Sequence, residues 1–176
     1  MRIISGKYRG KHILPPAGFN VRPTTDFAKE SLFNILTNSY DFEEIRVLDL
    51  FSGTGGISYE FASRRCPAID AIEINPQHVA FIKRMAKELK FDQLHVIRND
   101  AFKFLDFCKA TYDIIFADPP YVFDSLEPIP NIVFTRNLLN KDGMLIVEHS
   151  DNNDFSTDSH FIDRRHYGGV NFSFFK

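Results

Sequence analysis

The sequence has no tryptophan and only two cysteines, Cys66 and Cys108, in 176 residues. Two cysteines do not form a disulfide framework, and a structural zinc site needs about four ligands, so neither is indicated. No apolar run reaches the roughly 18 residues of a membrane span. The opening MRIISGKYRG lacks the apolar region of an export signal. These absences predict a cytoplasmic protein without a metal ion and without a membrane partner.

The net charge of −2 hides an uneven distribution of charge. Residues 1–25 carry five bases and no acid, whereas the remaining residues carry 16 bases and 23 acids. A basic arm on an acidic body favours contact with a polyanion such as nucleic acid; a solvated hairpin with incidental charge is the alternative. The length suits one domain. We therefore expect a small arm, residues 1–25, followed by a main domain, residues 26–176.

From residue 46 onward, apolar runs typical of strands alternate with helical patterns. We expect strands at 46–51, 69–74, 93–98, 112–118 and 144–150, and helices at 56–64, 76–90, 101–109 and within 124–139. A helix precedes them from Asp26, with Thr25 or Asp26 as N-cap. Residues 161–167 and 170–175 form an expected antiparallel pair, and the arm a β-hairpin. The alternation predicts an α/β fold: a mostly parallel twisted sheet, helices on both faces and a ligand at the carboxyl ends of the strands.

A glycine-rich turn, FSGTGG, follows the first strand of the main domain. Gly53 and Gly55 let the backbone turn sharply and approach a ligand. Asp49 precedes them within the strand, where its charge would repel the pyrophosphate of NAD but suits the cationic S-adenosylmethionine (SAM). Ser58 also stands where a NAD site would have its third glycine. The turn therefore favours SAM, and a tight turn with incidental acids is the alternative.

Acids also follow the next two strands. Glu73 ends the second strand, 18 residues after Gly55, where a carboxylate can accept hydrogen bonds from both ribose hydroxyls. Asp100 follows the third strand and can bind the adenine amine or cap the helix that begins at Ala101. On the residues alone, capping is the favoured interpretation of Asp100.

The stretch IIFADPPY, residues 114–121, ends a buried strand in an acid, two prolines and an aromatic ring. Such an acid is costly unless the site uses it. Asp118 and the carbonyl of Pro119 can each accept one N–H of a planar nucleobase amine, and Tyr121 can stack on the base. Asp118 is then placed to take the proton that leaves during methyl transfer. A type I turn is the structural alternative.

These motifs, in this order, resemble those of SAM-dependent amino-methyltransferases with their Rossmann-like fold. Two further segments, RIISGKYRGKHI and VRPTTDFAKESLFNIL, are similar to the opening of the RsmD family, bacterial enzymes that methylate the N2 amine of guanine 966 in 16S ribosomal RNA. The resemblance extends over nearly the whole chain. DPPY alone is less specific, because DNA adenine methyltransferases share it.

The resemblance implies a role for each matched residue. Eight would bind SAM: Asp49, Phe51, Gly53, Gly55, Glu73, Ile74, Asp100 and Ala101. Asp118, Pro119 and Tyr121 would hold the guanine. Lys7, Arg9, Lys11, Arg22, Thr24 and Thr25 would contact RNA. The chain departs from the family pattern at Phe27-Ala28, where a basic residue is expected, and Lys29 is the candidate to compensate.

Three functions stay open at this point. The first is a 16S ribosomal RNA guanine-N2 methyltransferase, a monomer that acts on the RNA or on a 30S assembly particle. The second is an amino-methyltransferase for DNA adenine or another RNA. The third is an idle RNA-binding module, which the intact DPPY argues against.

Overall fold

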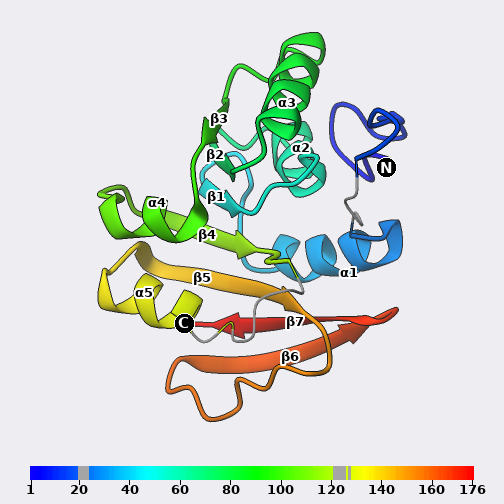
Figure 1. The fold of residues 1–176 in the computed structure, drawn as a ribbon. Coiled ribbons are helices and arrows are strands. Elements are labelled where there is room, and N and C mark those ends of the chain that lie inside the picture. Colours follow the sequence, from blue (N-terminus) through cyan, green and yellow to red (C-terminus); the bar gives the residue numbers. More distant parts are fainter. Residues whose placement is uncertain (20–23, 121–125, 127) are drawn as a thin grey trace.

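The computed structural model describes residues 1–19, 24–120, 126 and 128–176. Its elements match the predicted alternation (Figure 1). The helices are α1 (Asp26–Thr37), α2 (Gly56–Ser63), α3 (Pro76–Glu88), α4 (Ala101–Phe107) and α5 (Pro128–Thr135). The strands are β1 (Arg46–Leu50), β2 (Ala68–Glu73), β3 (Leu94–Arg98), β4 (Tyr112–Ala117), β5 (Leu139–His149), β6 (Phe161–Tyr167) and β7 (Val170–Phe175).

The strands form one seven-stranded sheet in the order β3-β2-β1-β4-β5-β7-β6. β1 to β5 are parallel, and β7 runs antiparallel to both β5 and β6. The predicted α/β fold with an antiparallel C-terminal pair is therefore confirmed. The order reverses at β1, which lies between β2 and β4, and the crevice at this point is where such sheets bind ligands.

Helices cover both faces of the sheet (Figure 1). On one face, α1, α2 and α3 pack in a cluster that includes Phe33, Phe61 and Phe81. On the other face, α4 and α5 pack in a second cluster with Leu105 and Ile129. Both faces of the central strands are thus buried, which explains why these strands are continuously apolar rather than alternating. β5 begins at Leu139, five residues before the predicted start, and pairs there with Tyr112 before an irregularity in the register.

The N-terminal arm is held to the main domain by backbone contacts. Its two ends meet in a single antiparallel bridge between Arg2 and His12, and Ile3 and Ile13 belong to the same cluster as α1 to α3. Gly6 has a φ of 80° and packs so closely that a Cβ there would lie 2.1 Å from the carbonyl oxygen of Ser63. The tip of the arm therefore rests on the C-terminal end of α2.

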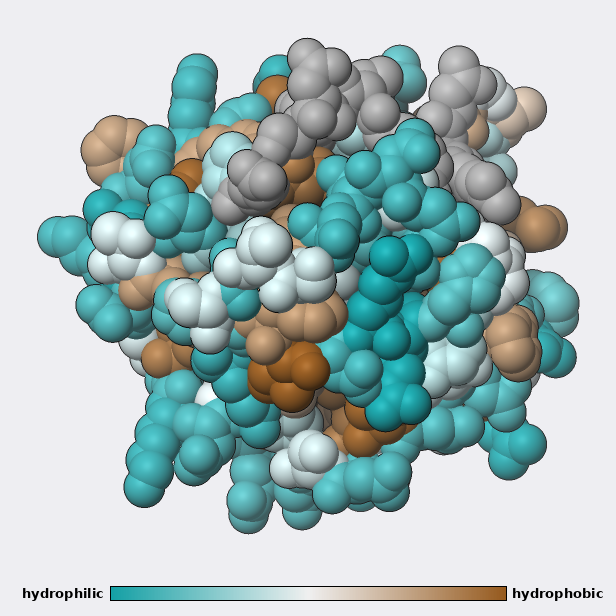
Figure 2. Space-filling view, turned by 90° about the horizontal axis from the view of Figure 1, so that it is seen from below, coloured by the Kyte–Doolittle hydropathy of each residue, from teal (hydrophilic) through white to brown (hydrophobic). Residues whose placement is uncertain are grey.

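The face of the molecule seen from below in Figure 2 is largely hydrophilic, and its hydrophobic residues form small separate patches. β6 is the outermost strand on this side, and Arg164, Arg165 and His166 are exposed on it. Charged side chains on an edge strand disfavour pairing with another sheet edge. In the described part of the chain, no helix is both long and apolar enough to span a membrane.

Candidate active site

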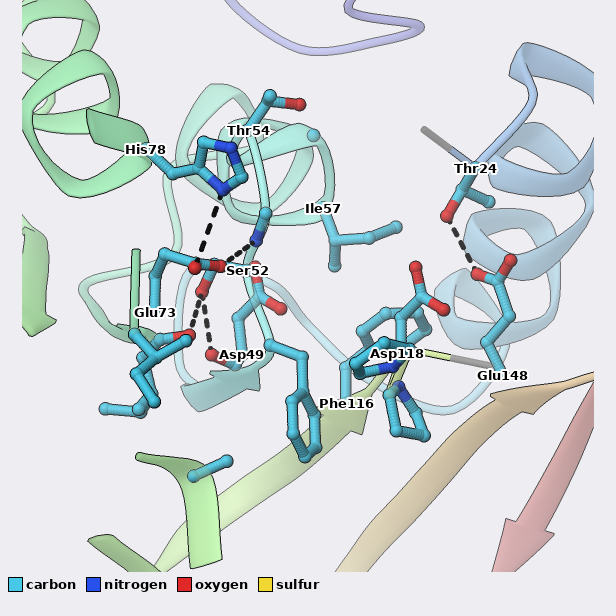
Figure 3. A pocket seen from close by; sticks show the side chains of 18 of the residues that line it. Thr24, Asp49, Ser52, Thr54, Ile57, Glu73, His78, Phe116, Asp118 and Glu148 are labelled. Atoms are coloured by element: carbon cyan, nitrogen blue, oxygen red, sulfur yellow. Dashed lines mark hydrogen bonds and ion pairs between the residues drawn. The ribbon is translucent and has the colours of Figure 1, made fainter. Parts of the chain in front are cut away.

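A cavity of about 470 Å³ lies at the carboxyl ends of β1, β2 and β4. This volume is in the range of small-molecule sites. The cavity contains most of the predicted site residues (Figure 3). Those that line it are Thr24, Thr25, Asp49, Phe51, Gly53, Glu73, Ile74, Asp100, Ala101, Asp118 and Pro119. Gly55 lies in the turn beside it, and Tyr121 and Arg22 lie outside the described residues.

The glycine-rich turn bends through three left-handed residues, Phe51, Gly53 and Gly55, with φ of 61°, 55° and 84°. Gly55 is the N-cap of α2, and a Cβ on it would lie 2.7 Å from the Tyr59 ring. Glycine is therefore required at position 55 by conformation and by packing. Phe51 adopts the left-handed conformation without being glycine, a strained arrangement of the kind that gathers at functional sites.

Asp49 is a buried acid beneath this turn, with 1% of its surface exposed. The hydroxyl of Ser58 donates a hydrogen bond to Asp49 Oδ2. Burial raises the pKa of Asp49 to about 7, although the Ser58 hydrogen bond lowers it. Burial makes the ionised form of such an acid energetically unfavourable, and a bound cation stabilises this charged form. Asp49 therefore fits the cationic methionine end of SAM.

Glu73 ties the end of β2 to the glycine-rich turn. Its Oε2 accepts from the backbone N–H of Gly53 at 2.8 Å, and its Oε1 accepts from Asn75 N–H at 2.8 Å. His78 Nδ1 lies 3.5 Å from Oε1. An ionised carboxylate has about four acceptor positions, so two oxygens with one backbone partner each retain capacity for two ribose hydroxyls.

The remaining cofactor candidates form an apolar border with a capped helix beside it. Ile74 is 62% exposed although it is apolar, and it faces the cavity. Asp100 is the N-cap of α4 and accepts from Lys103 N–H at 2.9 Å, so the predicted capping role is confirmed. A buried acid, a ribose acceptor and an exposed apolar edge together fit SAM.

Among the described residues, no group of three or more His, Cys, Asp or Glu side chains is arranged to hold a metal ion.

Asp118 follows β4 at the other end of the cavity (Figure 3), and Pro119, the next residue, also lines it. β4 pairs with β1 so that Phe116 lies opposite Asp49, which brings Asp118 to the same edge as the glycine-rich turn. Burial, and then the charges of Glu148 and Asp49, raise the pKa of Asp118 well above its ordinary value. A carboxyl group with a raised pKa is a better proton acceptor than an ordinary aspartate.

Glu148 is a site residue that the sequence analysis missed. It lines the cavity from β5, is 3% exposed, and its Oε2 accepts from the hydroxyl of Thr24 at 2.8 Å. The available signal was the one used for Asp118, an acid at the end of an apolar strand. Thr24 thereby connects the segment before α1 to the edge of the sheet at which β5 ends.

Three basic residues of the arm, Lys7, Arg9 and Lys11, do not line the cavity. Lys11 is 3.7 Å from Glu88, at the C-terminal end of α3, whereas His78 near the N-terminal end of α3 lines the cavity. Lys7 N–H donates to the carbonyl of Ser63, at the C-terminal end of α2. The structure therefore brings Thr24 and Thr25, but not Lys7, Arg9 or Lys11, to the candidate active site.

The expectation that Lys29 replaces a basic RNA contact is wrong. Its side chain is 2% exposed, and its Nζ lies 3.1 Å from Glu60 Oε1, which is fully buried. The same ammonium also donates to the carbonyl of Arg2. The ammonium is thus directed into the protein, so Lys29 holds the arm and two helices together.

Known proteins resemble this chain in sequence and in fold. The family model described as "Conserved hypothetical protein 95" matches residues 1–176. Ribosomal RNA small subunit methyltransferase D of Buchnera aphidicola subsp. Baizongia pistaciae is 33% identical over 148 residues, 84% of this chain and 75% of that protein. The protein of the same name from Escherichia coli strain K12 is 29% identical over 157 residues, 89% of this chain and 78% of that protein.

The solved structure of the Escherichia coli protein yhhF has a TM-score of 0.86 and 27% identity, and covers 99% of this chain and 96% of that chain. The methyltransferases among the relatives and solved structures confirm SAM as the predicted cofactor. The family match extends over every residue, and the motifs that carry the chemistry line one cavity. The chain therefore belongs to the Conserved hypothetical protein 95 family, the family of the RsmD-type methyltransferases.

Proposed function

We propose that the protein transfers a methyl group from SAM to the N2 amine of a guanine in 16S ribosomal RNA, by resemblance guanine 966. The observation that carries the proposal is the position of Asp118 and Pro119, which open into the same cavity as the glycine-rich turn and Asp49. Two relatives are named ribosomal RNA small subunit methyltransferase D, which supports ribosomal RNA as the substrate.

The proposed chemistry needs no covalent intermediate. SAM supplies an electrophilic methyl group. The N2 lone pair forms the new N–C bond while the S–C bond breaks, and its electrons stay on sulfur. Asp118 accepts one N–H and the Pro119 carbonyl the other, which turns the lone pair toward the methyl group. Asp118 then receives the proton that leaves the nitrogen, and alignment of the reactants supplies on the order of 7–11 kcal/mol.

We assign the RNA contacts to two separate regions. Thr24 and Thr25 line the cavity, and together with Arg22 they would contact the nucleotides next to the target. Lys7, Arg9 and Lys11, in the arm of residues 1–25, would bind phosphates farther away. α3 has 13 residues, so its ends are about 20 Å apart. RNA that fills the site and reaches the arm must therefore extend over about this distance. Tyr121 would stack on the guanine once it leaves its helix.

We also infer that the protein acts as a cytoplasmic monomer on 16S RNA or on a 30S assembly particle.

The test of the proposed function is incubation with methyl-labelled SAM and three substrates: naked 16S RNA, assembled 30S particles and duplex DNA. Nucleoside mass spectrometry then locates the label. N2-methylguanosine at one position in either RNA substrate is the expected result. Label on adenine, or in DNA alone, overturns the proposal.

A further inference from the structure

Asp118 and Glu148 form a pair of acids at the ends of adjacent strands. β4 and β5 are parallel, with Phe116 opposite Ile146, and both of these residues pack in the cluster that faces α1 to α3. Side chains alternate along a strand with a period of two. Asp118 and Glu148, two positions farther on, therefore point to this same face, and neighbouring strands are only about 5 Å apart.

The environment of the two acids agrees with this placement. Figure 3 shows both carboxylates directed from the ends of the strands into the same part of the cavity, with Thr24 beside Glu148. The charge of Glu148 is the largest electrostatic contribution to the raised pKa of Asp118. Placing two acids in one buried site costs stability, because each disfavours ionisation of the other. A ligand that donates to both would offset that cost.

Nucleobases differ in the hydrogen-bond donors next to their exocyclic amine. Guanine offers three N–H groups on this edge, one from N1 and two from N2. Adenine and cytosine offer two, because the ring nitrogen beside the amine is an acceptor. Asp118 and the Pro119 carbonyl account for the two amine hydrogens. A second carboxylate beside them has a partner in guanine and would face a lone pair in adenine or cytosine.

We propose that Glu148 is the residue that selects guanine, by accepting a hydrogen bond from its N1–H. The inference rests on the proposed function and deepens it. The Thr24 hydroxyl donates to Oε2 of the Glu148 carboxylate, and an ionised carboxylate has about four acceptor positions on its two oxygens. A site built to pair with a donor rejects a base without it, because the buried charge is left facing an acceptor.

The test uses Glu148→Gln and a base analogue. The target guanine in 16S RNA is replaced by 2,6-diaminopurine, which keeps the N2 amine but has an acceptor at N1. The parent protein should prefer guanine by about 10- to 100-fold in kcat/KM, the value of a hydrogen bond to a charged group. In Glu148→Gln the amide N–H can donate to the diaminopurine N1. The guanine-to-diaminopurine ratio should then fall by about 100-fold or more.

Thr24→Val is the matched control. Glutamine keeps an acceptor for Thr24, so a purely structural Glu148 predicts that Glu148→Gln leaves base preference unchanged. Thr24→Val should lower turnover on both bases without changing their ratio, and SAM affinity shows that each variant is folded. An unchanged ratio in Glu148→Gln, with N2-methylguanosine still made by the parent, overturns the role of Glu148 alone. A parent protein that makes no N2-methylguanosine overturns this role together with the proposed function.

Discussion

Lys29 of α1 and Glu60 of α2 form a buried ion pair, with 3.1 Å between Nζ and Oε1. Arg64 Nη1 lies 2.6 Å from the other oxygen of Glu60, and the backbone N–H of Ile4 donates to Oε1 at 2.8 Å. The carboxylate thus has a charged partner on each oxygen and a third contact from the arm. Because α2 begins at the glycine-rich turn, this pair connects the arm and α1 to the candidate cofactor site.

Lys29→Met should destabilise the protein, since it leaves the buried Glu60 carboxylate with one cationic partner, Arg64, instead of two. Breaking a buried ion pair by removing one partner costs about 3–5 kcal/mol. For a chain of this size that lowers the melting temperature by on the order of 10 °C. Lys87→Met, which removes an exposed lysine from α3, is the control and should change stability by less than about 0.5 kcal/mol. Equal melting temperatures for both variants would refute the structural role of Lys29.

The fold could be predicted from the sequence because its strands are short apolar runs separated by helices with clear caps. Thr25 and Asn75, for example, cap α1 and α3 as their positions beside Asp26 and Pro76 indicate. Asp49, Glu73 and Asp118 could be placed together in one candidate site because parallel strands bring their carboxyl ends to one edge. These inferences need only local patterns and one rule of sheet architecture.

The features that the sequence analysis missed depend on long-range packing. Lysine is seldom buried, so the sequence favours an RNA contact for Lys29. Its partner Glu60 lies 31 positions away, on another helix. Glu148 lies near the end of β5, but its place in the site becomes clear only when β5 is known to lie beside β4. The arm could be predicted as basic, yet its docking against the C-terminal ends of α2 and α3 follows from contacts such as Lys11 with Glu88.

Asp118→Asn should abolish methyl transfer and spare cofactor binding. Asparagine keeps an acceptor for one N–H but cannot take the proton, and loss of such a group lowers the rate about 10²–10⁴-fold. SAM affinity, measured by calorimetry, should stay within about threefold, because binding energy lost only in the transition state does not appear in the ground state. Asp106→Asn, at an exposed position on α4, is the control. Turnover within tenfold of the parent would exclude Asp118 as the proton acceptor.

Asp49 should make SAM affinity depend on pH. Its pKa is about 7, so below this pH the proton must leave before the carboxylate can pair with a cation. Affinity should fall as the pH drops from 7, by up to about tenfold per unit. Asp49→Asn should bind SAM more weakly and without this dependence. Ser58→Ala removes the hydrogen bond that lowers the pKa, so the midpoint should move to higher pH. An identical pH profile in the parent and Asp49→Asn would show that Asp49 does not pair with the cofactor.

The same residue should limit stability when no cofactor is bound. The folded pKa of Asp49 lies above its ordinary value of 3.8, so the native state binds more protons between about pH 4 and 7 and loses stability as the pH rises through this window. Asp49→Asn removes this pH-dependent loss of stability, because asparagine does not ionise. The variant should exceed the parent in unfolding free energy at pH 8 by one to several kcal/mol, at about 1.4 kcal/mol per pKa unit, and should approach it near pH 4. Chemical denaturation at the two pH values measures the difference, and a parent that is more stable than the variant at pH 8 would contradict it.

The arm should bind phosphates through interactions that salt weakens. Lys7→Glu combined with Arg9→Glu should reduce RNA affinity, and the slope of log K against log salt should become shallower by about 0.7–0.9 for each phosphate that the arm no longer neutralises. Lys109→Glu combined with Lys141→Glu makes the same change in net charge at two exposed sites outside the arm. The control variant should keep the parent slope, because the number of phosphates bound by the arm is unchanged. If both pairs of substitutions flatten the slope equally, RNA affinity depends on the net charge of the protein, and the arm does not bind phosphates specifically.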